Sequence, residues 1–274
     1  MKIWLNGALQ DDPAAAGLSP LDHGLTTGDG VFETVKIVDG QPFAVTKHLD
    51  RLVRSATGLG LPAPDRDEVE RAIAEVVKAD PEIAFGRLRI TYTGGVSPLS
   101  SDRGTAGPTL VVATQAIERP APSTAIVTVP WVRNERSAVA GLKTTSYAEN
   151  VRALAYAKER GGTEAIFANT VGDLCEGTGA NIFCVYGGEL VTPTLESGAL
   201  AGVTRALVIA WFGAVERDVP LARLAEADEI FLTSTTRDVQ AVHRCDDREL
   251  AAPGEVTAAV AKVFAERSAE DIDP

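Results

Sequence analysis

Apolar residues early in the chain alternate first with strand spacing and then with helix spacing. Residues 31–38 favour a strand, Asp39-Gly40 is a hairpin turn signal, and Pro42–Val45 is expected to return as a second strand. A helix then follows to about Thr57, with Thr46 as its expected cap. One face of this helix carries the apolar side chains Leu49, Leu52, Val53 and Ala56.

A second helix and two further strands complete this first region. Asp65 followed by Glu68 resembles a capping box, and the helix it opens should end before Asp80-Pro81. Strands are expected over 85–93 and 109–117. Residues 118–123, Glu-Arg-Pro-Ala-Pro-Ser, have the composition of a linker.

The remainder of the chain mixes strands and helices in a similar way. Ser146 with Glu149 forms a second capping-box pattern, which predicts a helix to Arg160. Residues 203–212 are apolar nearly all round, which is typical of a buried helix. A terminal helix is expected over 255–267, and strands over 124–129, 164–168, 181–186, 189–192 and 229–233. This order favours an α+β fold with a small domain over 1–117, a linker over 118–123 and a larger domain over 124–274.

Charge and composition exclude several classes of function. The chain has 26 basic and 38 acidic side chains, a net charge of −12, which is the wrong sign for binding nucleic acid or anionic membranes. No apolar segment resembles a secretory signal, and the longest apolar stretch, 206–215, is too short to span a bilayer. The three cysteines and three histidines are scattered, which argues against a disulfide framework and a metal site. We expect a cytoplasmic protein.

One of the seven lysines stands in an unusual place. Lys143 lies in a loop rich in small and hydroxyl residues, just before a predicted helix N-terminus. The helix dipole and partial burial would both lower the pKa of an amine there, as a Schiff-base nucleophile requires. Taken alone, the pattern favours a solvated loop lysine.

Glu176 lies in a glycine-rich segment, Glu-Gly-Thr-Gly-Ala-Asn, over 176–181. Glycines there allow the backbone to approach a flat ligand, and the carboxylate is suited to hold a protonated ring nitrogen. A glycine turn with a surface acid is the alternative interpretation.

Two further segments have the chemistry of anion sites. The first N–H groups of the helix that begins at Val203 and Thr204 need partners, and a phosphate is suitable, although the preceding loop is an alternative cap. The hydroxyl run 233–236 ends an apolar strand and has the donors for a second anion cradle or for an ordinary polar turn. Arg51 lies opposite the apolar stripe of its helix, so it should face solvent or a separate cavity.

In chain order, these segments resemble the class IV pyridoxal-phosphate aminotransferase family. That family includes D-amino-acid and branched-chain aminotransferases and 4-amino-4-deoxychorismate lyase. The similarity extends over nearly the whole chain and rests on the segments 28–34 (Gly-Asp-Gly-Val-Phe-Glu-Thr), 48–52 (His-Leu-Asp-Arg-Leu), 142–147 (Leu-Lys-Thr-Thr-Ser-Tyr), 176–183, 202–205 and 227–235.

The resemblance implies a fold of type IV, with a small N-terminal α/β lobe, a larger barrel-like C-terminal lobe, and pyridoxal 5'-phosphate enclosed between them in a homodimer. It implies that Lys143 is the Schiff-base lysine and moves the proton, and that Glu176 pairs with the pyridinium nitrogen. Around the phosphate it implies Arg51, Val203, Thr204, Thr235 and Thr236.

Departures from the family patterns bear on the substrate. Thr34 follows Phe32-Glu33 where branched-chain members usually have glycine, and Gly94 stands where many lyases and D-amino-acid members have an arginine. Arg89 and Arg103 are then the candidates for binding the substrate carboxylate. Phe32 and Tyr147 complete the expected substrate site, although Tyr147 follows the lysine by four residues rather than the usual five.

The expected function is therefore transfer of an amino group between an amino acid, with a D-amino acid favoured, and a 2-oxo acid. The alternative within the same family is 4-amino-4-deoxychorismate lyase, which would use Lys143 and Glu176 to release pyruvate and 4-aminobenzoate. A cofactor-binding or scaffold protein without turnover is the alternative from another class.

Overall fold

The computed structural model describes residues 1–14 and 16–274, and the chain forms two compact units. The first unit contains residues 1–119 together with two later segments, 142–146 and 272–274. The second contains 120–141 and 147–271. The segment that carries Lys143 thus belongs with the first 119 residues. None of the helices formed by the described residues is long and apolar enough to cross a membrane.

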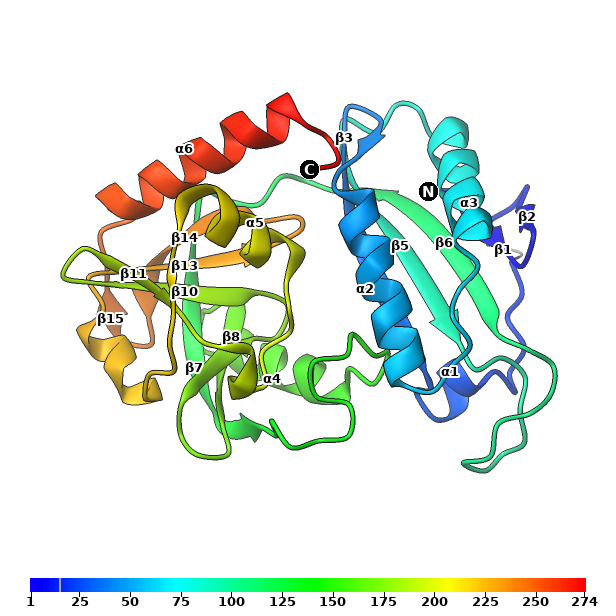
Figure 1. The fold of residues 1–274 in the computed structure, drawn as a ribbon, viewed down its shortest axis with the longest axis horizontal. Helices are drawn as coiled ribbons and strands as arrows, with labels where there is room; N and C mark the ends of the chain where they lie inside the picture. Colours follow the sequence, from blue (N-terminus) through cyan, green and yellow to red (C-terminus); the bar gives the residue numbers. More distant parts are fainter. Residues whose placement is uncertain (15) are drawn as a thin grey trace. The chain divides into compact units, whose positions relative to one another are not determined.

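An antiparallel six-stranded sheet forms the base of the first unit, in the order β2-β1-β6-β5-β3-β4. Two long helices, α2 and α3, cover one of its faces (Figure 1). The strands are β1 (Ile3–Leu5), β2 (Ala8–Leu9), β3 (Gly30–Val38), β4 (Gln41–Pro42), β5 (Phe85–Thr93) and β6 (Thr109–Ala116), and the helices are α1 (His23–Thr26), α2 (Val45–Gly58) and α3 (Arg66–Ala79).

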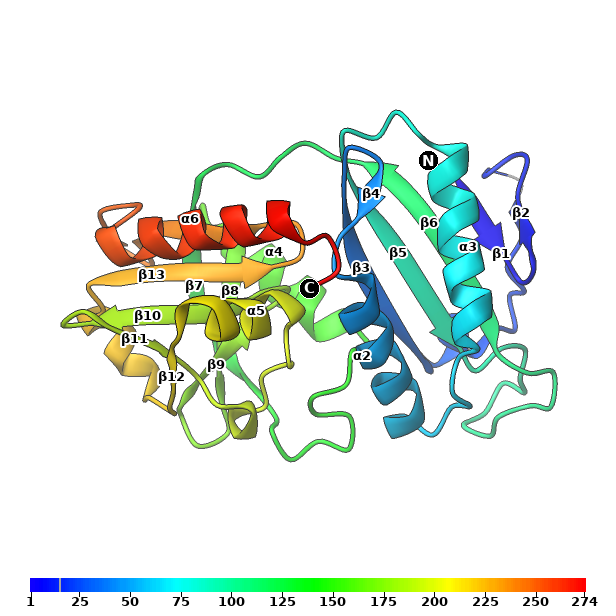
Figure 2. The ribbon, with the colours of Figure 1, turned by 45° about the horizontal axis from the view of Figure 1, so that its top comes forward.

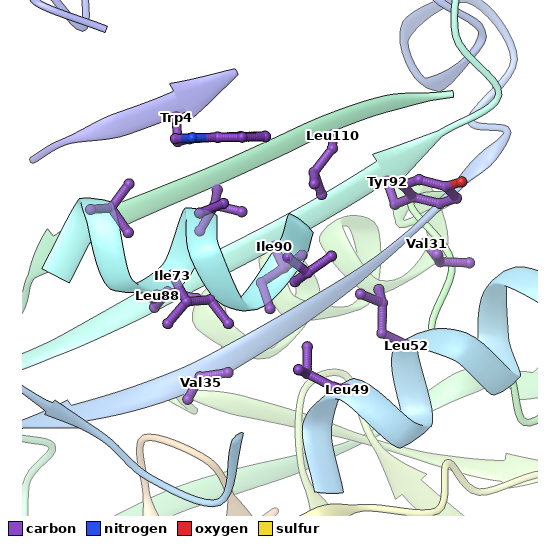
Figure 3. Close-up of a cluster of buried hydrophobic side chains, with 14 of the residues drawn as sticks. Trp4, Val31, Val35, Leu49, Leu52, Ile73, Leu88, Ile90, Tyr92 and Leu110 are labelled. Carbon is purple, nitrogen blue, oxygen red and sulfur yellow. The ribbon is translucent and has the colours of Figure 1, made fainter. Parts of the chain in front are cut away.

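Alternation along the strands decides what each face of this sheet carries. Figure 3 shows Val31 and Val35 of β3 gathered with the α2 residues Leu49 and Leu52 in the apolar core. Because successive side chains on a strand point to opposite faces, Phe32 and its neighbours at every second position face away from the helices. The sheet therefore has one largely apolar face under the helices, and Phe32 and its alternate neighbours lie on the other face.

The hairpin return and the start of α2 differ from the sequence prediction. The returning strand is only two residues long, because Val45 is already the first residue of α2. Thr46 is not the N-cap. That position is held by Ala44 in a left-handed conformation, φ 57°, with no side chain able to cap.

The missing cap comes from the far end of the chain. Asp273 accepts hydrogen bonds from Thr46 N at 2.9 Å and from Thr46 Oγ1 at 2.6 Å, and Ala44 N donates to Ile272 O at 2.7 Å. A carboxylate at a helix N-terminus satisfies an N–H donor and complements the helix dipole. Residues 272–274 thus stabilise the helix that carries His48 and Arg51.

Removing this cap should weaken the first unit. We expect Asp273→Ala to lower the free energy of unfolding by about 1 kcal/mol, the usual contribution of a helix N-cap. Urea denaturation followed by circular dichroism measures this. Asp273→Asn keeps an oxygen acceptor and should lose less. Equal losses in the two variants would show that the hydrogen bonds to Thr46 do not carry the effect.

The helix α3 and the two central strands agree with the sequence prediction. Asp65 accepts from Asp67 N and Glu68 N at the start of α3, as expected of an N-cap. The helix ends at Ala79, before Asp80-Pro81. The strand β5 has the predicted bounds, and β6 ends one residue earlier than predicted, at Ala116.

The second unit contains a nine-stranded mixed sheet, in the order β12-β11-β10-β13-β14-β7-β8-β9, with β15 paired to β14. The strands are β7 (Ser123–Arg133), β8 (Glu164–Asn169), β9 (Leu174–Gly177), β10 (Asn181–Tyr186), β11 (Glu189–Thr192), β12 (Val215–Glu216), β13 (Glu229–Ser234), β14 (Asp238–Cys245) and β15 (Arg248–Glu249). Contacts between β9 and β10 show that the sheet curls back on itself. Together with the first unit, this confirms the predicted mixed fold.

Three α-helices flank this curled sheet, with 3-10 turns over Leu195–Ser197 and Leu221–Glu226. The helix α4 (Ala148–Lys158) packs on β7 and β8, whereas α5 (Val203–Phe212) and α6 (Glu255–Glu270) contact β13. Figure 2 shows α6 running along β13.

Two helix predictions need correction here. Ser146 does not cap α4, since the N-cap is Tyr147 without a side-chain bond, and the Ser146 hydroxyl donates instead to Gly28 O at 3.1 Å. The helix also ends at Lys158 rather than Arg160. The helix α5 has the predicted bounds but is buried only in part, because Phe212 at its end is 38% exposed.

Candidate active site

Lys143 is held against β3 through its backbone. Phe32 N donates to Lys143 O at 2.9 Å, Thr145 N donates to Gly30 O at 2.8 Å, and Val31 forms an isolated β-bridge with Thr144. Lys143 N also donates to Ser55 Oγ at 3.2 Å. These bonds fix the backbone on both sides of the lysine, so its ammonium is presented from a rigid segment rather than from a mobile loop.

Two cations meet at one aromatic ring on the face of the first sheet that lies opposite α2 and α3. Lys143 Nζ lies 4.3 Å from the centroid of the Phe32 ring, and Arg89 Cζ lies 3.3 Å from it. Phe32 is only 3% exposed. The electron-rich ring attracts both cations, and cations held so close together favour an anionic ligand. The structure thus brings together three of the predicted site residues.

Arg51 is buried, contrary to the interpretation that it faces solvent. Its side chain is 4% exposed, and its Nε and Nη2 donate to Glu33 Oε1 and Oε2, each at 2.7 Å. His48 Nδ1 donates to Glu33 Oε2 at the same distance. The periodicity was misleading because Glu33 stands on the helix-facing side of β3, which places a carboxylate inside an otherwise apolar face.

The electrostatics of this group keep the carboxylate charged and the imidazole neutral. Burial alone would raise the pKa of Glu33, but the charge and hydrogen bonds of Arg51, with the bond from His48, hold that pKa well below its usual range. Burial lowers the pKa of His48. Glu33 acts to raise this pKa, and the positive charges of Arg51 and Lys143 act to lower it further.

Arg103, the other predicted carboxylate ligand, has a different set of partners. It donates to both oxygens of Asp29, at 2.7 Å each, and to the carbonyls of Leu59 and Gly60 at the end of α2. The hydrogen bond from Arg103 lowers the pKa of Asp29. These bonds use most of the donors of Arg103, whereas Arg89 lies with Lys143 at the Phe32 ring.

An open pocket of about 540 Å³ adjoins this ion pair, lined by residues that include His23, Asp29, Ser101 and Arg103. Lys143 is not among its lining residues. Because Asp29 forms an ion pair with Arg103 there, the pocket has little unbalanced positive charge with which to bind an anion.

In the second unit, Glu176 is oriented by three neighbours. Leu200 N donates to its Oε2 at 2.9 Å, Asn181 Nδ2 approaches the same oxygen at 3.5 Å, and Arg133 Nε lies 3.6 Å from Oε1. Its side chain is 13% exposed. These contacts fix the carboxylate in place, as a partner for a protonated ring nitrogen must be.

Glu176 is linked to the N-terminus of α5 by the turn that follows Leu200. Gly202 is the N-cap of α5 and has no side chain to cap the N–H groups of Val203 and Thr204. A Cβ at Gly202 would lie 1.9 Å from Asn181 Oδ1, so a larger residue there would force the Asn181 side chain to shift. The ten-residue helix thus begins with uncapped donors, the arrangement that binds phosphate in many proteins.

The hydroxyl run 233–236 ends β13 beside the start of β10. Thr233 pairs with Asn181 across these strands. Thr233 Oγ1 is buried and has no hydrogen-bond partner among the described residues. Thr235 and Thr236 form the turn that follows, and both are half-buried. A buried hydroxyl without a partner is costly, and an anion would supply the acceptor that it lacks.

The thiols of the chain do not compete with Lys143 as nucleophiles. Burial raises the pKa of Cys175 and of Cys184 to about 12, and that of Cys245 to about 11. Thiols with such pKa values carry almost no thiolate at neutral pH. All three are free and buried.

The pattern of the family described as "Amino-transferase class IV" matches residues 30–245. The chain belongs to the class IV aminotransferase family. Among curated relatives of this aminotransferase, a putative branched-chain-amino-acid aminotransferase of Methanocaldococcus jannaschii is 33% identical over 262 residues, which cover 90% of this chain and 89% of the relative. A D-alanine aminotransferase of Staphylococcus haemolyticus is 27% identical over 266 residues, covering 91% and 90%.

Solved structures show the same fold as this aminotransferase. The branched-chain aminotransferase of Thermoproteus uzoniensis with norvaline superposes with a TM-score of 0.91 at 30% identity, covering 97% of this chain and 94% of the other. A putative 4-amino-4-deoxychorismate lyase of Legionella pneumophila has a TM-score of 0.84 at 25% identity, covering 94% and 97%. The predicted fold type IV architecture is therefore confirmed, with both units included.

Class IV aminotransferases are pyridoxal-phosphate enzymes, and the residues of this aminotransferase fit that cofactor. The uncapped start of α5 and the partnerless Thr233 hydroxyl suit a phosphate, and the fixed carboxylate of Glu176 suits a ring nitrogen. Four residues that orient the side chains of Arg51 and Glu176 were not singled out from the sequence. Each is a polar residue whose partner lies elsewhere in the fold: Glu33, His48, Arg133 and Asn181.

Proposed function

We propose that this protein binds pyridoxal 5'-phosphate through Lys143 and transfers an amino group between an amino acid and a 2-oxo acid. The observation that carries the proposal is the meeting of Lys143 and Arg89 at the Phe32 ring. An amine and a guanidinium held at one ring supply a nucleophile and, beside it, a partner for the carboxylate of an amino acid.

The bound cofactor supplies an electron sink for the charge that forms at the Cα of the substrate. Lys143 removes the Cα proton and returns a proton in the second half of the reaction. Glu176 holds the proton on the ring nitrogen, while Arg51, the amides of Val203 and Thr204, and the hydroxyls of Thr235 and Thr236 hold the phosphate. Tyr147 is retained as a residue of the substrate site.

For the donor, we propose a small D-amino acid. Thr34 lies directly opposite Arg89 in the pairing of β3 with β5, and it shares a sheet face with Phe32. A glycine at this position would leave space beside Arg89, and the threonine side chain fills it. This favours a compact donor such as D-alanine over a branched-chain amino acid. The D-alanine aminotransferases among the relatives support the same choice.

A panel of half-reactions tests the donor. D-alanine, L-alanine and L-valine are each mixed with the cofactor-loaded protein, and the loss of the visible absorbance band is followed. We expect a fast loss with D-alanine, and glutamate formation when 2-oxoglutarate is added. A fast loss with L-valine alone would replace our donor by a branched-chain amino acid and would leave the aminotransferase activity intact.

The second candidate is 4-amino-4-deoxychorismate lyase, which the similarity to the Legionella pneumophila structure favours. Both reactions need the same lysine and carboxylate, so the site residues do not separate them. Release of pyruvate from aminodeoxychorismate, in the absence of a 2-oxo acid, would identify the lyase. Glutamate formed only with D-alanine and 2-oxoglutarate would identify the aminotransferase.

We also propose that two copies of the chain associate. Exposed apolar side chains gather where α1 meets the loop after β5, since Asp22 bridges to Val96 and Ser97 N donates to Leu21 O. Leu25 is 66% exposed and Leu99 78%. Exposed apolar side chains gathered in this way are typical of a protein interface. Light scattering tests this, since a particle of twice the chain mass of 28.8 kDa would support the dimer and a particle of the chain mass would contradict it.

A further inference from the structure

Arg51 is paired with a fully buried carboxylate, that of Glu33. Glu33 has 0% exposure and accepts three hydrogen bonds of 2.7 Å, two from Arg51 and one from His48. The first two form a bidentate pair with one edge of the guanidinium. The His48 ring, 1% exposed, is equally enclosed. The three hydrogen bonds to Glu33 join β3 to α2.

The group is poorly explained as a device for stability alone. Removing two charges from water costs several kcal/mol for each ion, and a buried ion pair recovers this only in part. Apolar side chains of similar volume would stabilise the interior at least as well. The surroundings on both sides are apolar, with Val31, Val35, Leu49 and Leu52 in the same core. A charged group in that position is consistent with a role in placing the arginine.

The hydrogen bonds to Glu33 fix the side chain of Arg51. A free arginine loses about 2 kcal/mol of conformational entropy when it is ordered. The bidentate pair with Glu33 orders Arg51 in advance, and the bond from His48 fixes the rotamer of Glu33 in turn. A guanidinium ordered before the ligand arrives binds a phosphate more tightly, because the cost of ordering has already been met in folding.

We propose that Glu33 and His48 are positioning residues that hold Arg51 in the orientation that binds the phosphate of the cofactor. This rests on the proposed function, in which Arg51 contacts that phosphate. Neither residue touches the cofactor itself. His48 acts as a neutral donor from Nδ1, and Glu33 transmits its position to the guanidinium.

The proposal is tested by binding pyridoxal 5'-phosphate to the apo form of the full chain, followed by protein fluorescence. We expect Glu33→Gln to raise the dissociation constant roughly 10- to 100-fold, the size of loss that follows when a residue orienting a metal-ligating side chain is replaced. In an Arg51→Gln background, Glu33→Gln should cause no further loss, since the residue acts only through Arg51. The phosphorus resonance of the bound cofactor should shift in Glu33→Gln.

Two comparisons separate positioning from general destabilisation. Glu229→Gln is the matched control, since Glu229 also accepts three hydrogen bonds, from Val256 N, Thr257 N and Thr257 Oγ1, and these connect β13 to α6 in the second unit. It should lower the melting temperature without changing cofactor affinity. His48→Asn keeps a donor close to Nδ1 and should retain affinity, whereas His48→Ala should lose it. If Glu33→Gln does not fold, the two His48 variants carry the test.

The results that would overturn the proposal are distinct from those that would overturn the function. Equal cofactor affinity in Glu33→Gln and the parent protein, or an additive loss in the Arg51→Gln background, removes the positioning role and leaves the aminotransferase assignment untouched. Loss of affinity in both His48 variants alike would also contradict it. Absence of any cofactor binding by the parent protein would refute the proposed function instead.

Discussion

Replacement of Lys143 by alanine is expected to lower the rate of amino transfer by at least roughly 1,000-fold, because the variant loses both the nucleophile and the base that moves the Cα proton. The fold should persist. The segment is held by the backbone N and O of Lys143 and by Thr145, and the substitution leaves these bonds in place. Cofactor affinity should fall only in part, because the phosphate contacts remain.

The measurement is glutamate formation, accompanied by borohydride reduction and peptide mapping of the parent protein. We expect the reduced cofactor on Lys143. Lys36 is the main rival, since it lies on β3, the strand that contacts the Lys143 segment, and is only 4% exposed. Label on Lys36, or turnover by Lys143→Ala at the parent rate, would show that the nucleophile is misassigned. Lys262→Ala, at a side chain that is 75% exposed, serves as the control and should behave as the parent.

Elements with a clear period or clear end signals could be predicted from the sequence. The strand β5, the hairpin strands β10 and β11, and the helix α5 have the predicted bounds, because turn signals, mostly glycine or proline, lie close to their ends. The strand β14 (Asp238–Cys245) was missed. Its sequence, Asp-Val-Gln-Ala-Val-His-Arg-Cys, interrupts the apolar residues with polar ones, and its pairing with β13 and β7 decides its structure.

Long-range partners account for the errors at the helix ends. The cap of α2 is Asp273, 227 residues from Thr46, and no local signal announces it. Similarly, Ser146 has the composition of an N-cap, but its hydroxyl donates to Gly28 O, 118 residues away. Local capping patterns predict a donor and an acceptor that are close in sequence. They fail when the fold brings a partner from a distant part of the sequence into hydrogen-bond distance.

In the candidate site too, local signals could be predicted from the sequence and long-range partners could not. Lys143 and Glu176 could be singled out from their local surroundings and from the family resemblance, because glycines and hydroxyls mark both segments. Arg51 could not be placed from helix periodicity, since its position depends on Glu33 from another element. The choice between Arg89 and Arg103 was also beyond the sequence. We propose Arg89 because the structure pairs Arg103 with Asp29, and this pair joins residues that are 74 positions apart in the sequence.

Replacement of Glu176 by glutamine should separate cofactor retention from proton transfer. A neutral amide no longer stabilises the proton on the ring nitrogen, so the electron sink weakens and removal of the Cα proton should slow about 100-fold. Retention should change little, because glutamine still presents an oxygen to Leu200 N and the phosphate contacts are unaffected. Exchange of the Cα proton of D-alanine in deuterated water measures the first quantity, and fluorescence titration with pyridoxal 5'-phosphate the second.

The matched control for this prediction is Glu149→Gln. Glu149 accepts a hydrogen bond from Arg133 Nη1 at 2.7 Å, so this change removes the other acidic partner of Arg133 and leaves Glu176 in place. It should leave proton exchange near the parent rate. Equal losses of exchange and retention in Glu176→Gln would mean that Glu176 only supports the turn before α5. A selective loss of exchange in that variant alone would place the carboxylate at the ring nitrogen, because only a group that tunes the electron sink slows proton removal while leaving binding intact.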